Sequence, residues 1–254
     1  MAALSVRELS LRFGGVDALS EVSLEIPDRS LFAVIGPNGA GKTSFFNCLT
    51  GYYRPTGGAV FFDERDITRL KAADVAALGI RRTFQNVRVF PKLSARENVL
   101  AGAHLRASAS FFGTLLGTPG HRRGEQALRE EADRWLDFVG LADKAAVLAG
   151  DLPYGMRKRL EVARALIAHP AVLLLDEPAA GVSSVEREEL ASVIHRTAAG
   201  GVTVVMIEHD VELVMQLAAG VAVLDRGRLL VQGSPEEVRA DPRVVEAYLG
   251  RRQR

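Results

Sequence analysis

Short apolar runs separated by polar and glycine-rich stretches recur along the chain and predict a sheet of buried strands. The runs LFAVI at 31–35, VLLL at 172–175 and VTVVMI at 202–207 are almost continuously apolar, as strands buried on both faces should be. Further runs of β-strand character lie at 22–26, 59–62 and 221–224. Because several runs alternate with helical patterns, we predict an α/β fold with a mainly parallel sheet and a partly antiparallel flank of early strands.

The pattern changes between residues 90 and 152, where helical periodicity replaces strand-like runs. Ser94 with Glu97 forms a capping-box start, and a helical apolar repeat follows at Leu128, Ala132, Trp135, Leu136 and Val139. We therefore predict a mainly helical inserted subdomain over 90–152. Within it, residues 107–124 carry Gly, Pro and Ser around two apolar pairs, which favours a surface loop over a dedicated contact site.

The length of 254 residues suits one large α/β domain with a smaller inserted subdomain. Ser234, Pro235 and Glu237 combine a cap, a first-turn proline and a capping partner, so the chain is expected to close with short helices. We predict a single domain over 1–250, followed by a basic tail at 251–254. Its expected parts are a core at 1–89 and 153–232, the helical subdomain at 90–152 and C-terminal helices at 233–250.

Composition limits the class of protein and its partners. Hydrophobic content of 48% and charged content of 25% are typical of globular proteins, and no apolar run approaches the roughly 18 residues needed to cross a bilayer. The net charge of +1 offers no general attraction to nucleic acid, so we expect no nucleic-acid partner. The first residues carry no secretory signal, which predicts a cytoplasmic protein. The single Cys48 is expected to be a buried apolar residue.

The sequence GPNGAGKT at 36–43 follows a buried strand and opens a helical segment, which is the context of a phosphate-binding loop. Its glycines allow a tight turn that points N–H groups inward, and the following helix presents the positive end of its dipole. Lys42 is expected to reach the β and γ phosphates, and Thr43 a bound Mg²⁺. We predict nucleotide binding by the loop and the residue after it, namely Gly36, Pro37, Asn38, Gly39, Ala40, Gly41, Lys42, Thr43 and Ser44.

Two carboxylates, Asp176 and Glu177, follow the apolar run at 172–175. Because successive strand residues point to opposite faces, the two cannot have the same role. We assign Asp176 to the Mg²⁺ shell, through water or directly, and Glu177 to the attacking water as its general base. A helix cap is the alternative for paired acids at a strand end, and the upstream phosphate loop favours the catalytic interpretation.

Three further positions are candidates for nucleotide chemistry. His209 follows the run at 202–207 and is expected at the carboxyl edge of the sheet, where open α/β sheets bind ligands. Gln85, in RTFQNVRVF, can supply an oxygen to the metal or a hydrogen bond to the water. Gly155 stands just before a predicted helix and can approach a phosphate closely, although its phosphate need not belong to the same nucleotide. The apolar face of that helix is expected at Met156, Leu160, Ala163 and Ile167.

Six motifs, in this order, resemble those of the ATP-binding subunits of ABC transporters across essentially the whole chain. GPNGAGKT resembles the Walker A loop, Gln85 the Q-loop glutamine, LPYGM the signature motif, VLLLDEP the Walker B motif, residues 180–183 the D-loop and His209 the switch histidine. The resemblance implies a P-loop NTPase core, ATP and Mg²⁺ as cofactors, and ATP hydrolysis coupled to transport. It also implies that Phe13 stacks on adenine and that Gly155 contacts an ATP held by a second subunit.

Within that family, RTFQNVRVF, LPYG followed by RLE, DEPAAG, IEHD and the terminal VVEAYLG most resemble ATPase subunits of branched-chain amino acid importers. Similar systems take up urea or short amides, so both cargoes are considered. The implied partners are a second ATPase subunit, identical or related, two membrane permease subunits and, indirectly, an extracytoplasmic solute-binding protein. The implied location is the cytoplasmic face of the plasma membrane, as a peripheral protein.

The sequence departs from the family pattern at the signature motif and the D-loop. The usual signature is LSGGQ, but Pro153 stands at its serine position and Met156 at its glutamine. We expect weaker stabilisation of the ATP of the second subunit, with Tyr154 as a substitute contact. Ser183 replaces the usual D-loop aspartate, which alters the hydrogen bonds expected across a dimer. The residues expected to bind and hydrolyse ATP are retained, so hydrolysis is still predicted.

Three other classes of protein share parts of this pattern. A soluble mechanochemical ATPase acting on DNA or ribosomes would be expected to have basic surfaces, long coiled arms or two fused cassettes, and the sequence contains none of them. A small-molecule phosphotransferase would leave LPYGM, the D-loop and His209 unexplained. A lipid exporter ATPase is closer, but its signature usually keeps LSGG.

Overall fold

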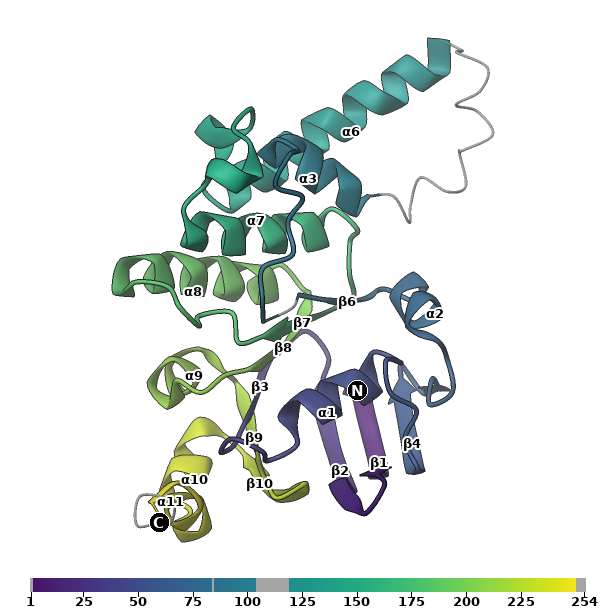
Figure 1. Ribbon diagram of the computed structural model, residues 1–254, viewed down its shortest axis with the longest axis vertical. Coiled ribbons are helices and arrows are strands. Elements are labelled where there is room, and N and C mark those ends of the chain that lie inside the picture. Colours follow the sequence, from purple (N-terminus) through teal and green to yellow (C-terminus); the bar gives the residue numbers. More distant parts are fainter. Residues whose placement is uncertain (1, 84, 104–118, 250–254) are drawn as a thin grey trace. The chain divides into compact units, whose positions relative to one another are not determined.

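The computed structural model describes residues 2–83, 85–103 and 119–249 of the chain. The chain divides into two compact units (Figure 1). The first comprises the described residues of Met1–Arg82, Ala171–Ala179 and Ile194–Arg254, and the second those of Thr83–Pro170 and Ala180–Val193. The first unit therefore contains the phosphate loop at 36–43, His209 and the two carboxylates at the end of an apolar strand, Asp176 and Glu177.

The first unit contains an antiparallel sheet in the order β2-β1-β4-β5. Its strands are β1 (Ala2–Phe13), β2 (Val16–Pro27), β4 (Gly57–Phe62) and β5 (Arg65–Asp66). This sheet confirms the predicted antiparallel flank. The sequence pattern did not predict β1, because a register shift between Val6 and Leu9 interrupts the alternation of apolar and polar residues.

A second sheet of the first unit has the order β10-β9-β3-β8-β7-β6 and is parallel except at β10. Every residue of β3, β7 and β8 is buried, which confirms that their apolar runs are covered on both faces. The strands are β3 (Leu31–Ile35), β6 (Ile80–Arg82), β7 (Val172–Asp176), β8 (Thr203–Ile207), β9 (Gly220–Asp225) and β10 (Arg228–Gly233).

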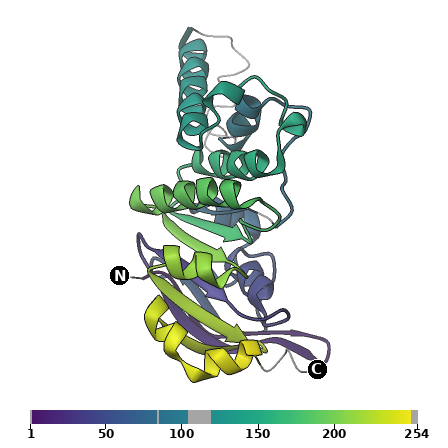
Figure 2. The same ribbon diagram turned by 90° about the vertical axis from the view of Figure 1, so that its left-hand side faces the viewer.

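Helices of the first unit cover these sheets. Phe45 and Phe46 of α1 are fully buried in the main hydrophobic cluster, so α1 is fixed on the core by two aromatic rings. In Figure 2 the yellow C-terminal helices α10 and α11 lie beside β9 and β10. The helices are α1 (Lys42–Leu49), α2 (Ala72–Ala77), α9 (Val211–Leu217), α10 (Pro235–Ala240) and α11 (Pro242–Leu249).

The second unit is helical, and α3, α6 and α7 pack against one another in it (Figure 1). Its helices are α3 (Ala95–Gly102), α6 (Pro119–Phe138) and α7 (Tyr154–Leu166), with short 3₁₀ turns at Ala142–Lys144 and Ala149–Asp151. Helix α8 (Ser184–Ala199) begins in this unit and ends in the first.

Both predicted capping boxes are present, one from Ser94 to Glu97 and one from Ser234 to Glu237. The surface loop predicted over 107–124 lies partly outside the described residues, namely at 107–118. Its remaining residues, 119–124, form the first turns of α6, so the prediction of a loop was wrong for them. None of the helices in the described ranges combines the length and apolar character that crossing a membrane requires.

Candidate functional site

The phosphate loop connects the end of β3 to the start of α1. Gly41 has φ of 99° directly before the helix, a conformation that residues with a side chain rarely adopt. A Cβ atom on Gly36 would lie 2.1 Å from the carbonyl oxygen of Leu224, so this position admits only glycine. These two glycines let the backbone turn tightly at the N-terminus of α1, where the helix dipole is equivalent to about +0.5 charge.

The ammonium group of Lys42 lies inside this loop. Its Nζ donates hydrogen bonds to the carbonyl oxygens of Gly36 at 2.6 Å and Pro37 at 3.0 Å, and the residue is only 6% exposed. Thr43, the next residue, is exposed. A buried cation and a helix N-terminus in one loop are suited to binding a phosphate group.

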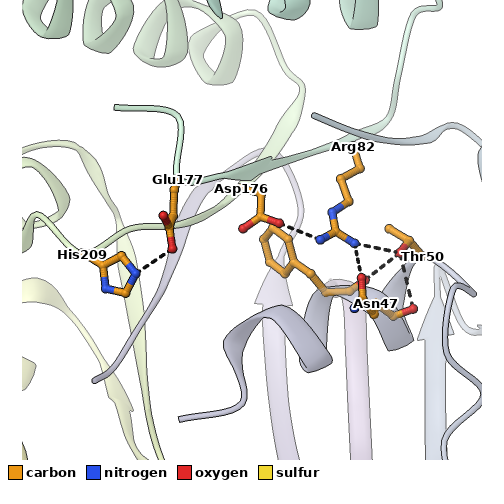
Figure 3. Close-up of polar contacts among 7 residues, drawn as sticks. Asn47, Thr50, Arg82, Asp176, Glu177 and His209 are labelled. Atoms are coloured by element: carbon orange, nitrogen blue, oxygen red, sulfur yellow. Dashed lines mark hydrogen bonds and ion pairs between the residues drawn. The ribbon is translucent and has the colours of Figure 1, made fainter. Parts of the chain in front are cut away.

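The acidic strand end presents its two carboxylates to different partners. Asp176 is the last residue of β7, and Glu177 follows with φ of 47°, a value that is uncommon for a residue other than glycine. The N–H of Glu177 donates to the carbonyl oxygen of Ile207 at 2.9 Å, which holds this turn against the end of β8. In Figure 3 the Glu177 side chain points toward His209, and that of Asp176 toward Arg82.

Glu177 and His209 form a close polar pair at the ends of β7 and β8. Oε1 of Glu177 lies 2.6 Å from Nε2 of His209 (Figure 3), and the side chains are 13% and 42% exposed. An ionised carboxylate only accepts hydrogen bonds, so this contact requires the ring tautomer that carries its hydrogen on Nε2. The pair is therefore oriented by a hydrogen bond and remains accessible to solvent on the histidine side.

Asp176 forms a buried ion pair with Arg82, a residue that the sequence analysis did not select. Oδ2 of Asp176 lies 2.6 Å from an Nη atom of Arg82, and the side chains are 6% and 7% exposed. The other Nη atom donates to Oδ1 of Asn47, also at 2.6 Å (Figure 3). The only signal in the sequence was an arginine three residues before Gln85, which by itself indicates no partner.

Glu208 is a second site residue that sequence reasoning missed. It is 3% exposed, and its carboxylate accepts the N–H of Ala179 at 2.8 Å and that of His209 at 3.1 Å. Burial raises the pKa of Glu208, although hydrogen bonds from backbone N–H groups oppose the shift. Through these hydrogen bonds Glu208 links Ala179, which follows Glu177, to the backbone of His209.

The predicted adenine-stacking residue, Phe13, is the last residue of β1 and is 46% exposed. Its ring contacts that of Tyr53 edge-on, with centroids 5.1 Å apart and an interplanar angle of 76°. One face of an aromatic ring held in this way suits stacking against a planar base.

The second unit holds the remaining predicted site residues. Gln85 is exposed, and its backbone carbonyl accepts a hydrogen bond from Nζ of Lys158 at 3.1 Å. Helix α7 begins at Tyr154, so Gly155 is its second residue, and the prediction that Gly155 precedes the helix was wrong. The reason is that Pro153 serves as the N-cap, which lets the helix start one residue before the glycine.

Gly155 lies against a carboxylate of the same unit. A Cβ atom on Gly155 would lie 2.4 Å from Oε1 of Glu186, so a larger residue at this position would have to displace the end of the Glu186 side chain. Ser183 and Glu186 form reciprocal hydrogen bonds, with the N–H of Ser183 donating to Oε2 at 3.0 Å and the N–H of Glu186 donating to Oγ at 3.3 Å. The backbone and hydroxyl bonds from Ser183 lower the pKa of Glu186.

The donors in the first unit fit a magnesium ion that is bound together with a nucleotide. Mg²⁺ commonly takes one or two protein ligands and completes its shell with phosphate oxygens and water. Among the residues that the structure describes, no group of three or more His, Cys, Asp or Glu side chains could hold a metal by itself. One carboxylate, Asp176, and one hydroxyl, Thr43, match the ion that shares its shell with phosphate.

The first unit contains an anion-binding loop and a carboxylate that is hydrogen-bonded to a histidine. The loop can hold polyphosphate through Lys42 and backbone N–H groups, and Glu177 is placed to accept a proton from water. This arrangement is suited to hydrolysis of a phosphoanhydride.

Comparison with known proteins agrees with the motifs. The family profile described as "ABC transporter" matches residues 19–180, and a profile described as "Branched-chain amino acid ATP-binding cassette transporter" matches residues 228–253. Among solved structures, the ADP conformation of an ATP-binding cassette of an ABC transporter is similar with a TM-score of 0.83 and 29% identity. That likeness covers 98% of this chain and 99% of the other.

Two curated relatives match over nearly their whole length. The high-affinity branched-chain amino acid transport ATP-binding protein BraF of Pseudomonas aeruginosa is 43% identical over 248 residues, covering 97% of each chain. The corresponding protein LivG of Salmonella typhimurium is 43% identical over 253 residues, again covering 97% of each.

Proposed function

Because the chain belongs to the ABC transporter family of ATP-binding cassettes, we propose that it is the ATP-hydrolysing subunit of a branched-chain amino acid importer. The assignment of the cargo rests on the match of residues 228–253 to the branched-chain profile. This segment lies outside residues 19–180, which match the general cassette profile. The full-length similarity to BraF and LivG supports the same cargo.

Nucleotide is bound by the phosphate loop and the exposed aromatic residue of β1. Lys42 exchanges its bonds to the carbonyls of Gly36 and Pro37 for bonds to the β and γ phosphates. Backbone N–H groups of the loop, which Pro37 lacks, contribute further bonds. Phe13 stacks on the adenine, with Tyr53 fixing the orientation of its ring.

Thr43, Gln85 and Asp176 are the residues that would hold Mg²⁺ in this proposal. When bound, the ion would neutralise part of the negative charge on the phosphates. Asp176 suits this role because it is ordered at the end of β7 by its ion pair with Arg82.

Glu177 acts as the general base in hydrolysis. It accepts a proton from the water whose oxygen bonds to the γ phosphorus, while the bond from that phosphorus to the β–γ bridging oxygen breaks and ADP leaves. His209 donates a hydrogen bond to Glu177 and holds the carboxylate in one orientation. Gln85 is the further residue proposed to orient the water.

Two such cassettes, identical or related, form a dimer that encloses ATP. The phosphate loop of one subunit lies on one side of the ATP, and Tyr154 and Gly155 of the other subunit lie on the opposite side. Ser183 of the D-loop is hydrogen-bonded to Glu186 within its own subunit. Because Pro153 stands where the usual signature has a serine, Gly155 is proposed as the principal contact across the dimer. The dimer drives two membrane permease subunits that receive cargo from a solute-binding protein. The location that follows is peripheral, at the cytoplasmic face of the plasma membrane.

Uptake in cells tests the cargo directly. Cells lacking this protein are supplied with the wild type or with Glu177→Gln, and uptake of labelled leucine and of labelled urea is measured. Leucine uptake that is lost in the deletion, restored by the wild type and not by the variant supports the proposal. Lost urea uptake with unchanged leucine uptake favours the urea and short-amide alternative, and no change in either contradicts an importer of these solutes.

A further inference from the structure

Arg82 connects two elements of the nucleotide site that are far apart in the sequence. It is the last residue of β6 and pairs in register with Leu174 of β7, the strand that ends at Asp176. Its side chain extends from this strand to the C-terminal half of α1 (Figure 3). The helix that begins at the phosphate loop and the strand that ends at the carboxylate are therefore bonded to the same guanidinium group.

The contacts of Arg82 use the two ends of its planar fork. One Nη atom bonds Oδ2 of Asp176 at 2.6 Å, and the other bonds Oδ1 of Asn47 at 2.6 Å and lies 3.5 Å from Oγ1 of Thr50. The guanidinium carbon lies 5.6 Å from the ring centroid of Phe46. A lysine has one nitrogen and cannot reproduce this two-sided geometry.

The burial of the pair limits what Asp176 can do. With side-chain exposures of 7% and 6%, Arg82 and Asp176 are both largely removed from water, so each charge depends on the other for compensation. Since Oδ2 is bonded to Arg82, the plane of the carboxylate is fixed relative to α1. Partners that orient a metal-associated carboxylate commonly set the affinity for the metal.

We propose that Arg82 is a positioning residue for the magnesium-bound nucleotide, because its bonds to Asp176 and Asn47 fix the carboxylate relative to the phosphate-loop helix. The inference rests on the proposed function in one respect, namely that the site binds nucleotide with Mg²⁺. It assigns to Arg82 no contact with the nucleotide itself. Its loss is therefore expected to weaken the effect of magnesium on binding rather than binding as such.

Calorimetric titration with ADP tests this, carried out once with excess MgCl₂ and once with EDTA. The ratio of the two affinities is the magnesium enhancement. We expect Arg82→Lys to lower this ratio by about tenfold, while its affinity in EDTA stays within about threefold of wild type. Arg81→Lys is the matched control, because Arg81 lies on the same strand and bonds the carbonyl oxygen of Ala76 instead. It should leave both affinities unchanged.

A second variant keeps the test informative if Arg82→Lys does not fold. Asn47→Ala retains the ion pair with Asp176 and removes the anchor on α1, so it should lower the ratio by about threefold. A double-mutant cycle tests whether Arg82 acts through Asp176. In the Asp176→Asn background, Arg82→Lys should lower the magnesium enhancement by less than about a further twofold, because the carboxylate that it positions is already absent.

The outcomes separate this inference from the proposed function. A folded Arg82→Lys or Asn47→Ala protein with the magnesium enhancement of the wild type overturns the role of Arg82. A loss in EDTA as large as the loss in MgCl₂ also overturns it, because it indicates a structural role only. Wild-type protein that binds no ADP in either buffer contradicts the proposed function, whatever the variants do.

Discussion

Nε2 of His209 lies 2.6 Å from Oε1 of Glu177, although the two residues are 32 positions apart in the chain. The approach depends on the turn at Glu177, whose φ of 47° directs the side chain away from the partner of Asp176. Such a conformation costs roughly 1–3 kcal/mol and persists only where surrounding structure enforces it. Here the bond from the N–H of Glu177 to Ile207 contributes that enforcement.

Glu177→Gln is expected to retain ATP binding and to lose turnover by roughly 10²–10⁴-fold, because an amide cannot accept the proton of the attacking water. The variant should also favour an ATP-bound dimer. Phosphate release measures turnover and filter binding measures retention of ATP. Hydrolysis at the wild-type rate would falsify the assignment of Glu177 as general base.

Lys42→Ala should show the opposite behaviour and lose nucleotide affinity, since it removes the buried ammonium group of the phosphate loop. We expect a loss of about 1.5–3 kcal/mol, or roughly 10- to 150-fold. The same filter assay separates this variant from Glu177→Gln. ATP retention equal to that of the wild type would show that the loop binds phosphate without its lysine.

The sequence pattern predicted some strands of the parallel sheet and missed others. Strands β3, β7 and β8 were predicted because burial on both faces leaves an almost continuous apolar run in the sequence. Strand β6 was missed, since its three residues, IRR, include two arginines at the edge of the sheet. The short strand nevertheless carries Arg82.

The candidate site shows the same distinction. Lys42 and the acidic pair belong to local motifs, so their spacing alone predicted them. Arg82 and Glu208 stand in the segments RTFQNVRVF and IEHD, but neither segment indicates which residue the side chain contacts. Arg82 meets Asp176 across 94 positions, and Glu208 meets Ala179 across 29, so only the pairing of strands brings them together. Their chemistry is a property of the tertiary structure.

Glu208 gives a pH dependence of stability. Burial raises its pKa above the ordinary value of 4.5, so above pH 4.5 the native state retains a proton that the unfolded state releases. The stabilisation by Glu208 is therefore fully present below pH 4.5 and is lost as pH rises through the raised pKa. Glu208→Gln cannot ionise and lacks this loss.

We compare the free energies of unfolding of Glu208→Gln and the wild type. The value of the variant minus that of the wild type should increase as the pH rises from 5 to 8. Each pH unit between the two pKa values contributes about 1.4 kcal/mol. Urea unfolding of both proteins at several pH values measures the difference. A relative stability of the variant that falls with pH would contradict the raised pKa.

Cys48 should be inert to alkylation in the native protein. It is 4% exposed, and burial raises the pKa of its thiol to about 12, so very little thiolate is present or reachable at neutral pH. Labelling with iodoacetamide, followed by mass spectrometry, should proceed only as fast as the protein opens and should accelerate in urea. Complete native labelling within minutes would indicate an accessible thiol.

In the proposed function, ATP hydrolysis at Glu177 powers import of branched-chain amino acids. The most direct test is to reconstitute the transporter in proteoliposomes with its membrane subunits and solute-binding protein, and to measure ATP hydrolysis and leucine accumulation in the same preparation. Glu177→Gln should abolish both together while the complex stays assembled and binds ATP. Leucine accumulation that continues at the wild-type rate without hydrolysis would contradict it.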